Sequence, residues 1–143
     1  MSGFVIDASV ALKWFWAEAH SAEARLLREQ GHDLHAPDYI LIEISAVICQ
    51  RVRRRLLTAE QGRLSLRAVS GLPIALISST DLLPNAAELA LDSGCSCYDA
   101  LYLSLAVAQQ TQVVTDDQRF IRTMRNTAYS QNLIWVGDLG ATS

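Results

Sequence analysis

Short apolar runs alternate with longer segments of mixed polarity along the whole chain. Each short run is bounded by polar or turn-forming residues, a pattern that predicts a buried β-strand. The five predicted strands cover residues 1–6, 34–36, 73–77, 112–115 and 133–136. The longer segments predict helices over residues 10–17, 21–30, 37–57, 58–71, 81–94, 98–110 and 117–125. This alternation indicates an α/β fold with a central, mostly parallel sheet of about five strands and helices on both faces.

Polar residues beside the predicted helices indicate where several of them begin. Ser9 is expected to cap the first helix with its hydroxyl, and Thr80 or Asp81 is expected to cap the helix that follows the third strand. Residues 58–61, Thr-Ala-Glu-Gln, have the pattern of a capping box and predict a new helix there. Residues 137–143 are expected to be loosely held at the end of the chain.

Acidic residues stand at corresponding places in these predicted units. Asp7 and the pair Asp116 and Asp117 directly follow strands, whereas Glu43 and Asp99 lie near the beginnings of helices. In an open parallel sheet, the carboxyl ends of the strands and the first turns of the following helices meet at one edge. We therefore expect these acidic side chains to gather at that edge.

A cluster of carboxylates in apolar surroundings indicates a bound cation. A buried carboxylate without a partner is costly because it loses its hydration. Mg²⁺ and Mn²⁺ prefer oxygen ligands and keep several of their waters. The expected cofactor is therefore Mg²⁺ or Mn²⁺, and the expected chemistry is hydrolysis of a phosphodiester by a metal-activated water.

Each acid also has a purely structural interpretation. Asp7 can cap a helix, Asp99 can complement a helix dipole, and Asp116 or Asp117 can serve in a turn. Glu43 is harder to explain in this way because it lies within an apolar segment. Taken together, four acids at corresponding fold positions favour a functional site.

The charge balance argues against a domain with a dominant positive field. The chain has 12 Lys and Arg against 15 Asp and Glu, a formal net charge of -3. Arg51, Arg53, Arg54 and Arg55 nevertheless fall close together. This cluster fits either phosphate binding or the C-terminal end of a helix dipole, while Arg53 and Arg55 taken singly fit a solvated face.

Length and composition favour one intracellular domain. No repeat, low-complexity tract or linker interrupts residues 1–143, which are enough to bury about two thirds of the unfolded surface. The three cysteines are odd in number, and Cys95-Ser96-Cys97 lacks zinc-binding or redox spacing, which favours a reducing, cytoplasmic setting. No apolar stretch reaches the roughly 18 residues of a membrane helix, so no membrane association is expected.

The acids stand in ordered motifs that extend over nearly the whole chain. These motifs are Val5-Ile6-Asp7-Ala8-Ser9-Val10, Glu43 within a helix, Tyr98-Asp99-Ala100-Leu101-Tyr102 and Val114-Thr115-Asp116-Asp117. A strand that ends in Asp is a weak signal, whereas the ordered set is specific. The set resembles the PIN-domain family, especially the VapC-type toxins of bacterial toxin–antitoxin pairs.

The resemblance implies an endoribonuclease, dependent on Mg²⁺ or Mn²⁺, that cuts single-stranded or looped RNA. It carries Asp7, Glu43 and Asp99 over as catalytic and metal-binding carboxylates. A fourth acid usually follows the strand in a Thr-x-Asp pattern, which points to Asp117, with Asp116 as its rival. Family members commonly form homodimers and are neutralised by a small antitoxin. The expected partners are therefore RNA, a second copy of the chain and a VapB-like antitoxin.

Ser9, Arg54 and Thr115 are the expected substrate-binding residues. Ser9 supplies the hydroxyl beside Asp7, and Thr115 belongs to the motif that carries the fourth acid. Arg54 lies eleven residues beyond Glu43. That separation is about three helical turns, or ~16 Å along nearly the same face. Such a distance suits a phosphate that flanks the scissile one.

Other classes of protein fit the residues less well. A receiver-like phosphoacceptor needs a lysine after a late strand, but the only lysine in the sequence is Lys13. A haloacid-type phosphatase needs Asp-x-Asp after the first strand, whereas residues 7–9 of this chain are Asp-Ala-Ser. His20, His32 and His35 lie away from the acids, so metal-free histidine catalysis is not expected. The alternative that stays open is a non-catalytic PIN-like module that binds RNA or protein.

Overall fold

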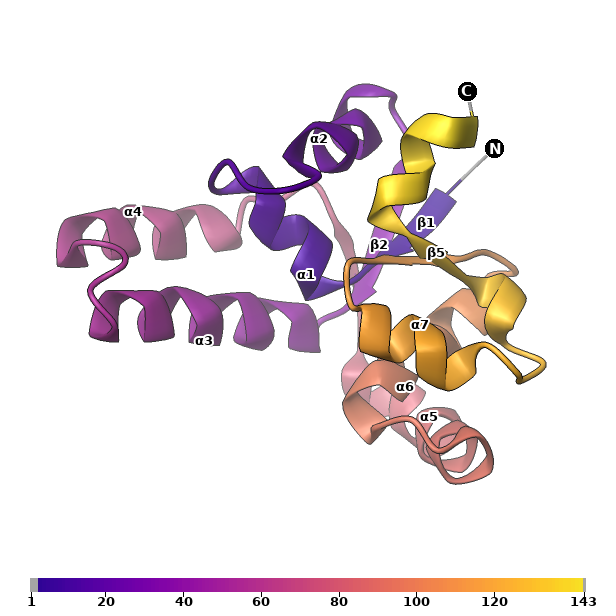
Figure 1. Ribbon diagram of the computed structural model, residues 1–143. Helices are drawn as coiled ribbons and strands as arrows, with labels where there is room; N and C mark the ends of the chain where they lie inside the picture. The colour runs from indigo at the N-terminus through magenta and orange to yellow at the C-terminus, as the bar shows by residue number, and fades with distance from the viewer. Residues whose placement is uncertain (1–2, 143) are drawn as a thin grey trace.

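The central sheet of the molecule is wholly parallel in the residues that the structure describes. The structure is a computed structural model that describes residues 3–142 and the side chains of residues 3–140. The five strands form one sheet in the order β3-β2-β1-β4-β5, and β1, β2 and β5 are labelled in Figure 1. They are β1 (Gly3–Ile6), β2 (Asp33–Pro37), β3 (Ala75–Ile77), β4 (Val113–Thr115) and β5 (Leu133–Trp135). The predicted α/β class is therefore confirmed, while Met1 and Ser2 of the predicted first strand lie outside the described residues.

The strand order reverses beside β1. The chain builds β2 and β3 outward on one side of β1 and then places β4 and β5 on the other side. Val5 pairs with Val113 and Ile6 with Val114, so β1 and β4 end together. The residues that follow these two strands leave the sheet side by side at the switch point, where ligands bind in open α/β folds.

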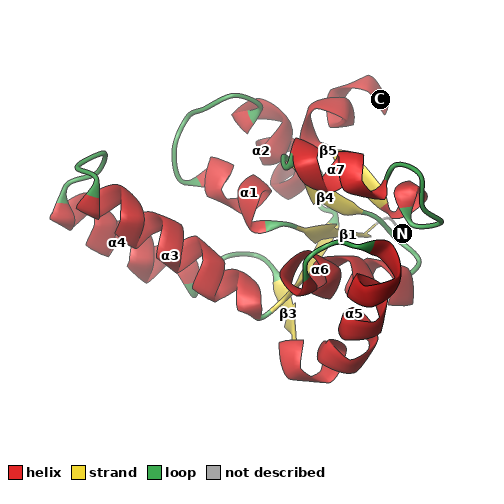
Figure 2. Cartoon of the chain, turned by 60° about the horizontal axis from the view of Figure 1, so that its bottom comes forward, coloured by secondary structure: helices red, strands yellow, loops and turns green. Residues whose placement is uncertain are grey.

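Helices cover the sheet on both sides. The α-helices are α1 (Ala8–Ala11), α2 (Ser21–Glu29), α3 (Tyr39–Arg53), α4 (Ala59–Val69), α5 (Ser79–Ser93), α6 (Cys97–Ala108) and α7 (Gln118–Met124), and the 3₁₀ segments are η1 (Leu12–Trp14), η2 (Ser130–Asn132) and η3 (Val136–Thr142). In Figure 2, α1 and α2 lie on one side of the sheet, and α5 and α6 lie on the other. Helix α6 packs on β1, β2 and β4, and α5 packs on α6.

The sequences of β1 and α6 explain their central places. Val5 and Ile6 of β1 are both fully buried, as expected for a parallel strand that is covered on both faces. Every residue of α6 from Ala100 to Ala106 is buried. A helix that is apolar all round belongs in a core, and α6 lies between the sheet and α5.

Helices α3 and α4 form a hairpin that extends beyond the sheet (Figures 1 and 2). The predicted capping box of α4 is confirmed, because Thr58 Oγ1 accepts the Gln61 N–H at 3.1 Å and Gln61 Oε1 accepts the Thr58 N–H at 2.9 Å. Helix α3 is shorter than predicted. It ends at Arg53 because Arg55 takes a left-handed conformation, with φ of 61°, where the chain turns back.

Several predicted helix starts are wrong by a few residues. Ser9 lies inside α1 rather than at its N-cap, which is Asp7, and the chain tightens into η1 after Ala11. Ser78, not Thr80 or Asp81, caps α5. Helix α6 begins one residue before Tyr98 and is capped by Ser96. A run of polar residues offers several caps, and the point where the preceding chain turns selects one of them.

Three further segments differ from the predictions. Strand β3 begins at Ala75 rather than at Pro73, because the Ile74 N–H bonds to the carbonyl of Leu72 in a turn before the strand. Pro37 pairs with Ile77 in the sheet instead of opening α3. Residues 137–142 of the segment predicted to be loosely held belong to η3 (Val136–Thr142), which packs against α2, and Ser143 lies outside the described residues.

Candidate active site at the carboxyl edge of the sheet

Asp7 leaves the end of β1 and begins the turn into α1 with its side chain held from two directions. The residue is 8% exposed. Its Oδ2 accepts hydrogen bonds from the hydroxyls of Ser9, at 2.8 Å, and Thr115, at 2.7 Å. Its backbone N–H donates to the carbonyl of Val114 at 3.1 Å. The Asp7 carboxylate is therefore fixed by hydroxyl groups from α1 and from β4.

The same two hydroxyls fix the turn that follows β4. Ser9 Oγ accepts the N–H of Asp116 at 3.0 Å, and Thr115 Oγ1 accepts the N–H of Asp117 at 3.0 Å. Each hydroxyl thus donates to Asp7 and accepts from the turn. Two parallel chains of hydrogen bonds hold the turn in one position relative to Asp7.

The two adjacent acids of this turn point to different surroundings. Asp117 lies at the N-cap of α7, where its Oδ1 accepts the N–H groups of Arg119, at 3.0 Å, and Phe120, at 3.2 Å. Asp116 instead pairs with Lys13 at 2.9 Å and accepts a hydrogen bond from Trp135 at 3.0 Å. Asp117 lines the same pocket as Asp7, and Asp116 is absent from its lining. The placement therefore favours Asp117 as the fourth acid of the site.

Glu43 and Asp99 reach the same region from two helices. Glu43 lies in the second turn of α3, and it accepts a hydrogen bond from the hydroxyl of Tyr102 in α6. Asp99 lies in the first turn of α6, where its N–H donates to Ser96 Oγ at 3.0 Å. Both carboxylates are half-buried. The beginnings of both helices face the carboxyl edge of the sheet, as the sequence predicts.

The four acids share one open pocket of about 420 Å³. Its lining residues are Asp7, Ala8, Ser9, Leu12, Tyr39, Ile42, Glu43, Ala46, Val47, Asp99 and Asp117. None of these lining residues is a lysine or an arginine. The pocket thus gathers four carboxyl groups from α3, α6 and the ends of β1 and β4 without a cationic side chain in its lining.

Burial and mutual repulsion raise the pKa values of the pocket acids. Burial raises the pKa of Asp7, and the charge of Asp117 adds to the rise, although the hydrogen bonds to the carboxylate oppose it. Burial raises the pKa of Glu43 to about 7 despite the hydrogen bond from Tyr102, and the charges of Asp7 and Asp99 contribute. Burial, then the charges of Asp7 and Asp117, raise the pKa of Asp99 to about 6. An added cation would relieve this repulsion.

Replacement of Tyr102 by Phe should raise the pKa of Glu43 further. The phenol donates to the carboxylate of Glu43, so its loss removes a bond that favours the ionised form. The free energy of unfolding should fall by about 1 kcal/mol. Carboxyl NMR titration and urea denaturation measure the two effects, with Tyr129→Phe as the control outside the pocket. An unchanged Glu43 titration would show that Tyr102 does not hold this carboxylate.

The donor atoms of the pocket fit a hard divalent cation in type and in charge. The carboxylates of Asp7, Glu43, Asp99 and Asp117 supply oxygens only, which Mg²⁺ and Mn²⁺ prefer. Among the residues that the structure describes, no three Asp, Glu, His or Cys side chains stand close enough together to hold a metal ion. Binding would therefore require these carboxylates to converge by side-chain rotation, and the metal site stays a prediction.

The other predicted site residues lie in three different surroundings. Ser9 lines the pocket, although its hydroxyl is already bonded to Asp7 and to the turn after β4. Thr115 is fully buried, so its hydroxyl orients Asp7 and the contact with substrate predicted for it is not supported. Arg54 is exposed just beyond the end of α3 and does not line the pocket.

The sequence did not predict the contacts that two residues, Tyr102 and Lys13, make with acidic side chains. Tyr102 stands three residues after Asp99, a helical spacing that places both side chains on one face of α6. That spacing could have placed Tyr102 on the same face as Asp99, although not in contact with Glu43, which lies on another helix. Lys13 lies in the apolar segment Ala11-Leu12-Lys13-Trp14 and is 2% exposed. A lone lysine in such a segment signals a buried ion pair, because an unpaired ammonium is costly to bury.

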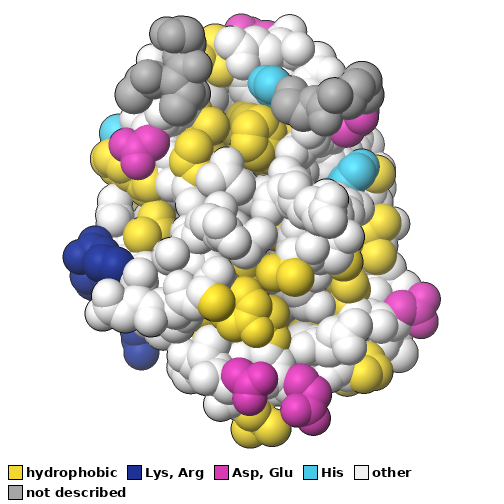
Figure 3. All heavy atoms as spheres, turned by 90° about the vertical axis from the view of Figure 1, so that its right-hand side faces the viewer, with side chains coloured by type: hydrophobic (Ala, Val, Ile, Leu, Met, Phe, Trp, Pro, Cys, Tyr) yellow, Lys and Arg dark blue, Asp and Glu magenta, His cyan; other side chains and the backbone are white. Residues whose placement is uncertain are grey.

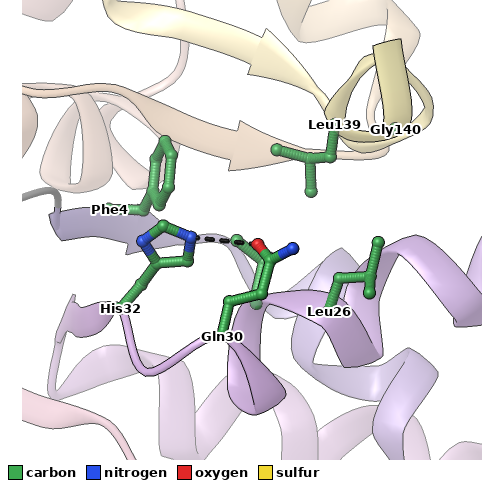
Figure 4. A pocket seen from close by; sticks show the side chains of 7 residues that line it. Phe4, Leu26, Gln30, His32, Leu139 and Gly140 are labelled. Carbon is green, nitrogen blue, oxygen red and sulfur yellow. Dashed lines mark hydrogen bonds between the residues drawn. The ribbon is translucent and has the colours of Figure 1, made fainter. Parts of the chain in front are cut away.

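A separate cavity of about 270 Å³ lies near the opposite edge of the sheet. Figure 4 shows it between Phe4, Leu26, Gln30 and His32 on one side and Leu139 and Gly140 of η3 on the other. His32 Nε2 and Gln30 Oε1 lie 3.2 Å apart. The cavity contains none of the predicted site residues and no acidic side chain, so the candidate chemistry lies at the carboxyl edge.

Solved structures share this fold. The structure of PAE2754 from Pyrobaculum aerophilum matches 99% of this chain and 96% of its own, with a TM-score of 0.68 and 20% identity. A toxin–antitoxin complex from Klebsiella pneumoniae matches 92% of this chain and 96% of its own, with a TM-score of 0.63 and 13% identity. VapC20 of Mycobacterium tuberculosis, described as a Sarcin-Ricin loop cleaving toxin, matches 82% and 92%, with a TM-score of 0.63 and 15% identity.

Sequence comparison gives a relative and a family. Ribonuclease VapC3 of Pyrobaculum aerophilum is 29% identical over 117 residues, which cover 80% of this chain and 89% of that protein. The model of the PIN domain matches residues 4–126, a stretch that includes all four carboxylates of the pocket. Because this match covers most of the chain, including the acids at the switch point of its sheet, the protein belongs to the PIN-domain family.

Proposed function

We propose that this protein is a metal-dependent endoribonuclease and the toxin of a VapBC-like toxin–antitoxin pair. The observation that carries the proposal is the pocket at the switch point, which is lined by four carboxylates from separate elements and by no basic side chain. The names of similar proteins support the same activity, because they include a ribonuclease and a toxin that cleaves an RNA loop. The reaction is hydrolysis of a phosphodiester bond in RNA.

Different residues of the chain have different roles in this reaction. When bound, Mg²⁺ or Mn²⁺ supplies an acidified water and offsets charge on the phosphate. Asp7, Glu43, Asp99 and Asp117 would hold the ion. Ser9 and the buried Thr115 keep Asp7 aimed at the pocket through their hydroxyls. The hydroxyl of Tyr102 holds the carboxylate of Glu43 in place at the pocket.

Purified protein should linearise a circular RNA in the presence of Mn²⁺. Linearisation needs an internal cut, so it separates endonuclease from exonuclease activity. EDTA should abolish the cut, and fresh Mn²⁺ or Mg²⁺ should restore it. Cleavage that survives thorough chelation would overturn metal dependence. A folded, antitoxin-free protein that binds RNA but never cuts would favour the non-catalytic binding module.

Arg54→Ala should weaken RNA binding and reduce its dependence on salt. Arg54 is exposed at the far end of α3, where it can meet a phosphate that flanks the cut. The face in Figure 3 shows Lys and Arg only near one edge, so that face offers little positive surface for RNA. Binding in an Asp7→Asn background at several salt concentrations measures the effect. Arg25→Ala, an exposed change on α2, is the control. If RNA affinity depends on salt concentration equally in both variants, Arg54 is a solvated surface residue without a contact to RNA.

The proposal includes protein partners. Large apolar side chains are exposed on the α3–α4 hairpin, with Ile42 at 63%, Leu56 at 67% and Leu64 at 59%. Exposed apolar surface of this kind supports binding to another protein, and a VapB-like antitoxin and a homodimer are the expected partners. A similar fold occurs in the toxin–antitoxin complex from Klebsiella pneumoniae.

The proposed location is the cytoplasm, where an antitoxin and RNA are both available. Within residues 3–142, no helix combines the length and the apolar character that a bilayer crossing needs. The thiols of Cys49, Cys95 and Cys97 are free. Free thiols suit a reducing compartment.

A further inference from the structure

Lys13 is a buried cation at the back of the acidic site. Its side chain is 3% exposed in η1, directly after the helix that carries Ser9. The ammonium pairs with Asp116 at 2.9 Å and with Glu18 at 3.1 Å, and it donates to the carbonyl of Ala19 at 2.7 Å. Three partners match the three protons of a lysine ammonium.

Asp116 is held on both of its carboxylate oxygens. Lys13 contacts Oδ2, and the indole N–H of Trp135 donates to Oδ1 at 3.0 Å. The backbone N–H of Asp116 donates to Ser9 Oγ, which in turn donates to Asp7. Lys13 is therefore connected to the Asp7 carboxylate through the turn after β4.

The position of Asp116 decides the position of its neighbour. Asp117 has an extended backbone, with φ of -81° and ψ of 95°, and successive side chains in extended chain point to opposite sides. When Asp116 faces Lys13, Asp117 faces the pocket, with one oxygen on the N–H groups of α7. Its other oxygen accepts none of these cap bonds and is available to the pocket.

We propose that Lys13 is a positioning residue that selects which of two adjacent carboxylates enters the acidic pocket. It holds Asp116 behind the turn after β4 and thereby keeps Asp117 beside Asp7. This inference rests on the proposed metal-dependent function of the pocket. It also explains how a site that already gathers four acids tolerates a fifth beside it.

Loss of the ammonium should disturb the pocket rather than only the fold. Without Lys13, Asp116 keeps only the neutral bond from Trp135, and a half-buried carboxylate seeks solvent or another cation. The acidic pocket lies next to the same turn, where Asp117 lines it. Rotation of the turn would bring Asp116 toward that space and draw Asp117 away from it, so the geometry around Asp7 would be lost.

The test uses Lys13→Met, which removes the charge and keeps most of the length of the side chain. We expect cleavage of circular RNA and Mn²⁺ affinity measured by calorimetry to fall about tenfold or more, because small displacements of reacting groups are costly. Asp116→Asn alone should stay close to wild type. The double variant Lys13→Met/Asp116→Asn should regain Mn²⁺ affinity and cleavage, since the competing carboxylate is gone.

Glu18→Gln is the matched control. Glu18 is the other acidic partner of Lys13, and it also accepts a hydrogen bond from Trp16 at 3.1 Å. Its neutralisation disturbs the same buried lysine but leaves the pair with Asp116, so Mn²⁺ affinity should be kept. A purely structural lysine predicts instead that Lys13→Met loses activity in proportion to its melting temperature, with no rescue by Asp116→Asn. That result would overturn the proposal.

Trp135→Phe keeps the inference testable if Lys13→Met does not fold. The change removes the second bond to Asp116, so it should weaken Mn²⁺ binding in the same direction and be rescued by Asp116→Asn. Wild-type protein is assayed beside every variant. Failure of the wild type to cut RNA would count against the nuclease alone, and Mn²⁺ affinities would still decide the role of Lys13: weaker binding with rescue supports it, and equal binding overturns it.

Discussion

Asp7→Asn should lower RNA cleavage by about 100-fold or more without destabilising the metal-free protein. The amide has the shape of the carboxylate, and its oxygen can accept the hydroxyls of Ser9 and Thr115 that now bond to Oδ2. Its NH₂ group cannot ligate a metal. The same change removes a buried charge whose pKa burial raises, so the melting temperature at pH 7 should stay equal or rise.

The neighbours of Asp7 provide a second measure of the same change. The charge of Asp7 helps to raise the pKa of Asp99 to about 6 and of Glu43 to about 7, so both values should fall in Asp7→Asn. Carboxyl NMR titration measures this shift. Asp92→Asn, an exposed change on α5, should alter neither cleavage nor these titrations. If Asp7→Asn cleaved RNA as fast as the wild type, Asp7 would not be part of the active site.

Metal-free protein should lose stability as the pH rises from about 4 to about 7. Glu43 has its pKa raised from 4.5 to about 7, and Asp99 has its pKa raised from 3.8 to about 6. A carboxyl group with a raised folded-state pKa holds its proton more tightly in the folded protein than in the unfolded chain. Its contribution to the free energy of unfolding is therefore complete at a pH below the unfolded-state pKa. That contribution is lost as the pH rises through the folded-state pKa. Because both groups are partly solvated, the combined loss should be about 1–3 kcal/mol.

Mn²⁺ should reverse this trend. The ion binds ionised carboxylates, so it should raise the melting temperature clearly at pH 8 and hardly at pH 5. Thermal unfolding across this pH range, with Mn²⁺ or with EDTA, measures the effect, and Asp7→Asn should respond less to Mn²⁺. A metal-free stability that rises between pH 5 and 7 would contradict the assigned repulsion. A Mn²⁺ response of equal size at both pH values would contradict binding by the pocket acids.

The architecture could be predicted from the sequence because strong local patterns carry it. The apolar run before Asp7 and the one before Asp116 identify central strands, and acids after such strands must lie at one edge of the sheet. Glu43 and Asp99 follow from the same rule applied to helix beginnings. The sequence could not fix the helix caps, because Ser78 and Ser96 compete with other polar residues nearby and tertiary position chooses among them.

The side-chain hydrogen bonds and ion pairs of the site could not be predicted from the sequence for a different physical reason. The choice between Asp116 and Asp117 depends on a lysine about 100 positions away along the chain and on Trp135 in the last strand. The bond from Tyr102 to Glu43 likewise joins two helices. Contacts of this kind are set by packing between elements, and no local periodicity reports them. The burial of Thr115 also depends on packing between elements, and its hydroxyl donates to Asp7.

The most direct test of the account compares wild type with Asp7→Asn in one assay. Both proteins, folded and free of antitoxin, are incubated with a mixed RNA pool in Mn²⁺ and, in parallel, in EDTA. The account predicts cutting by the wild type in Mn²⁺ only, with almost none by Asp7→Asn under either condition. Equal cutting by both proteins, or cutting by the wild type in EDTA, would contradict a metal-dependent nuclease built on these carboxylates.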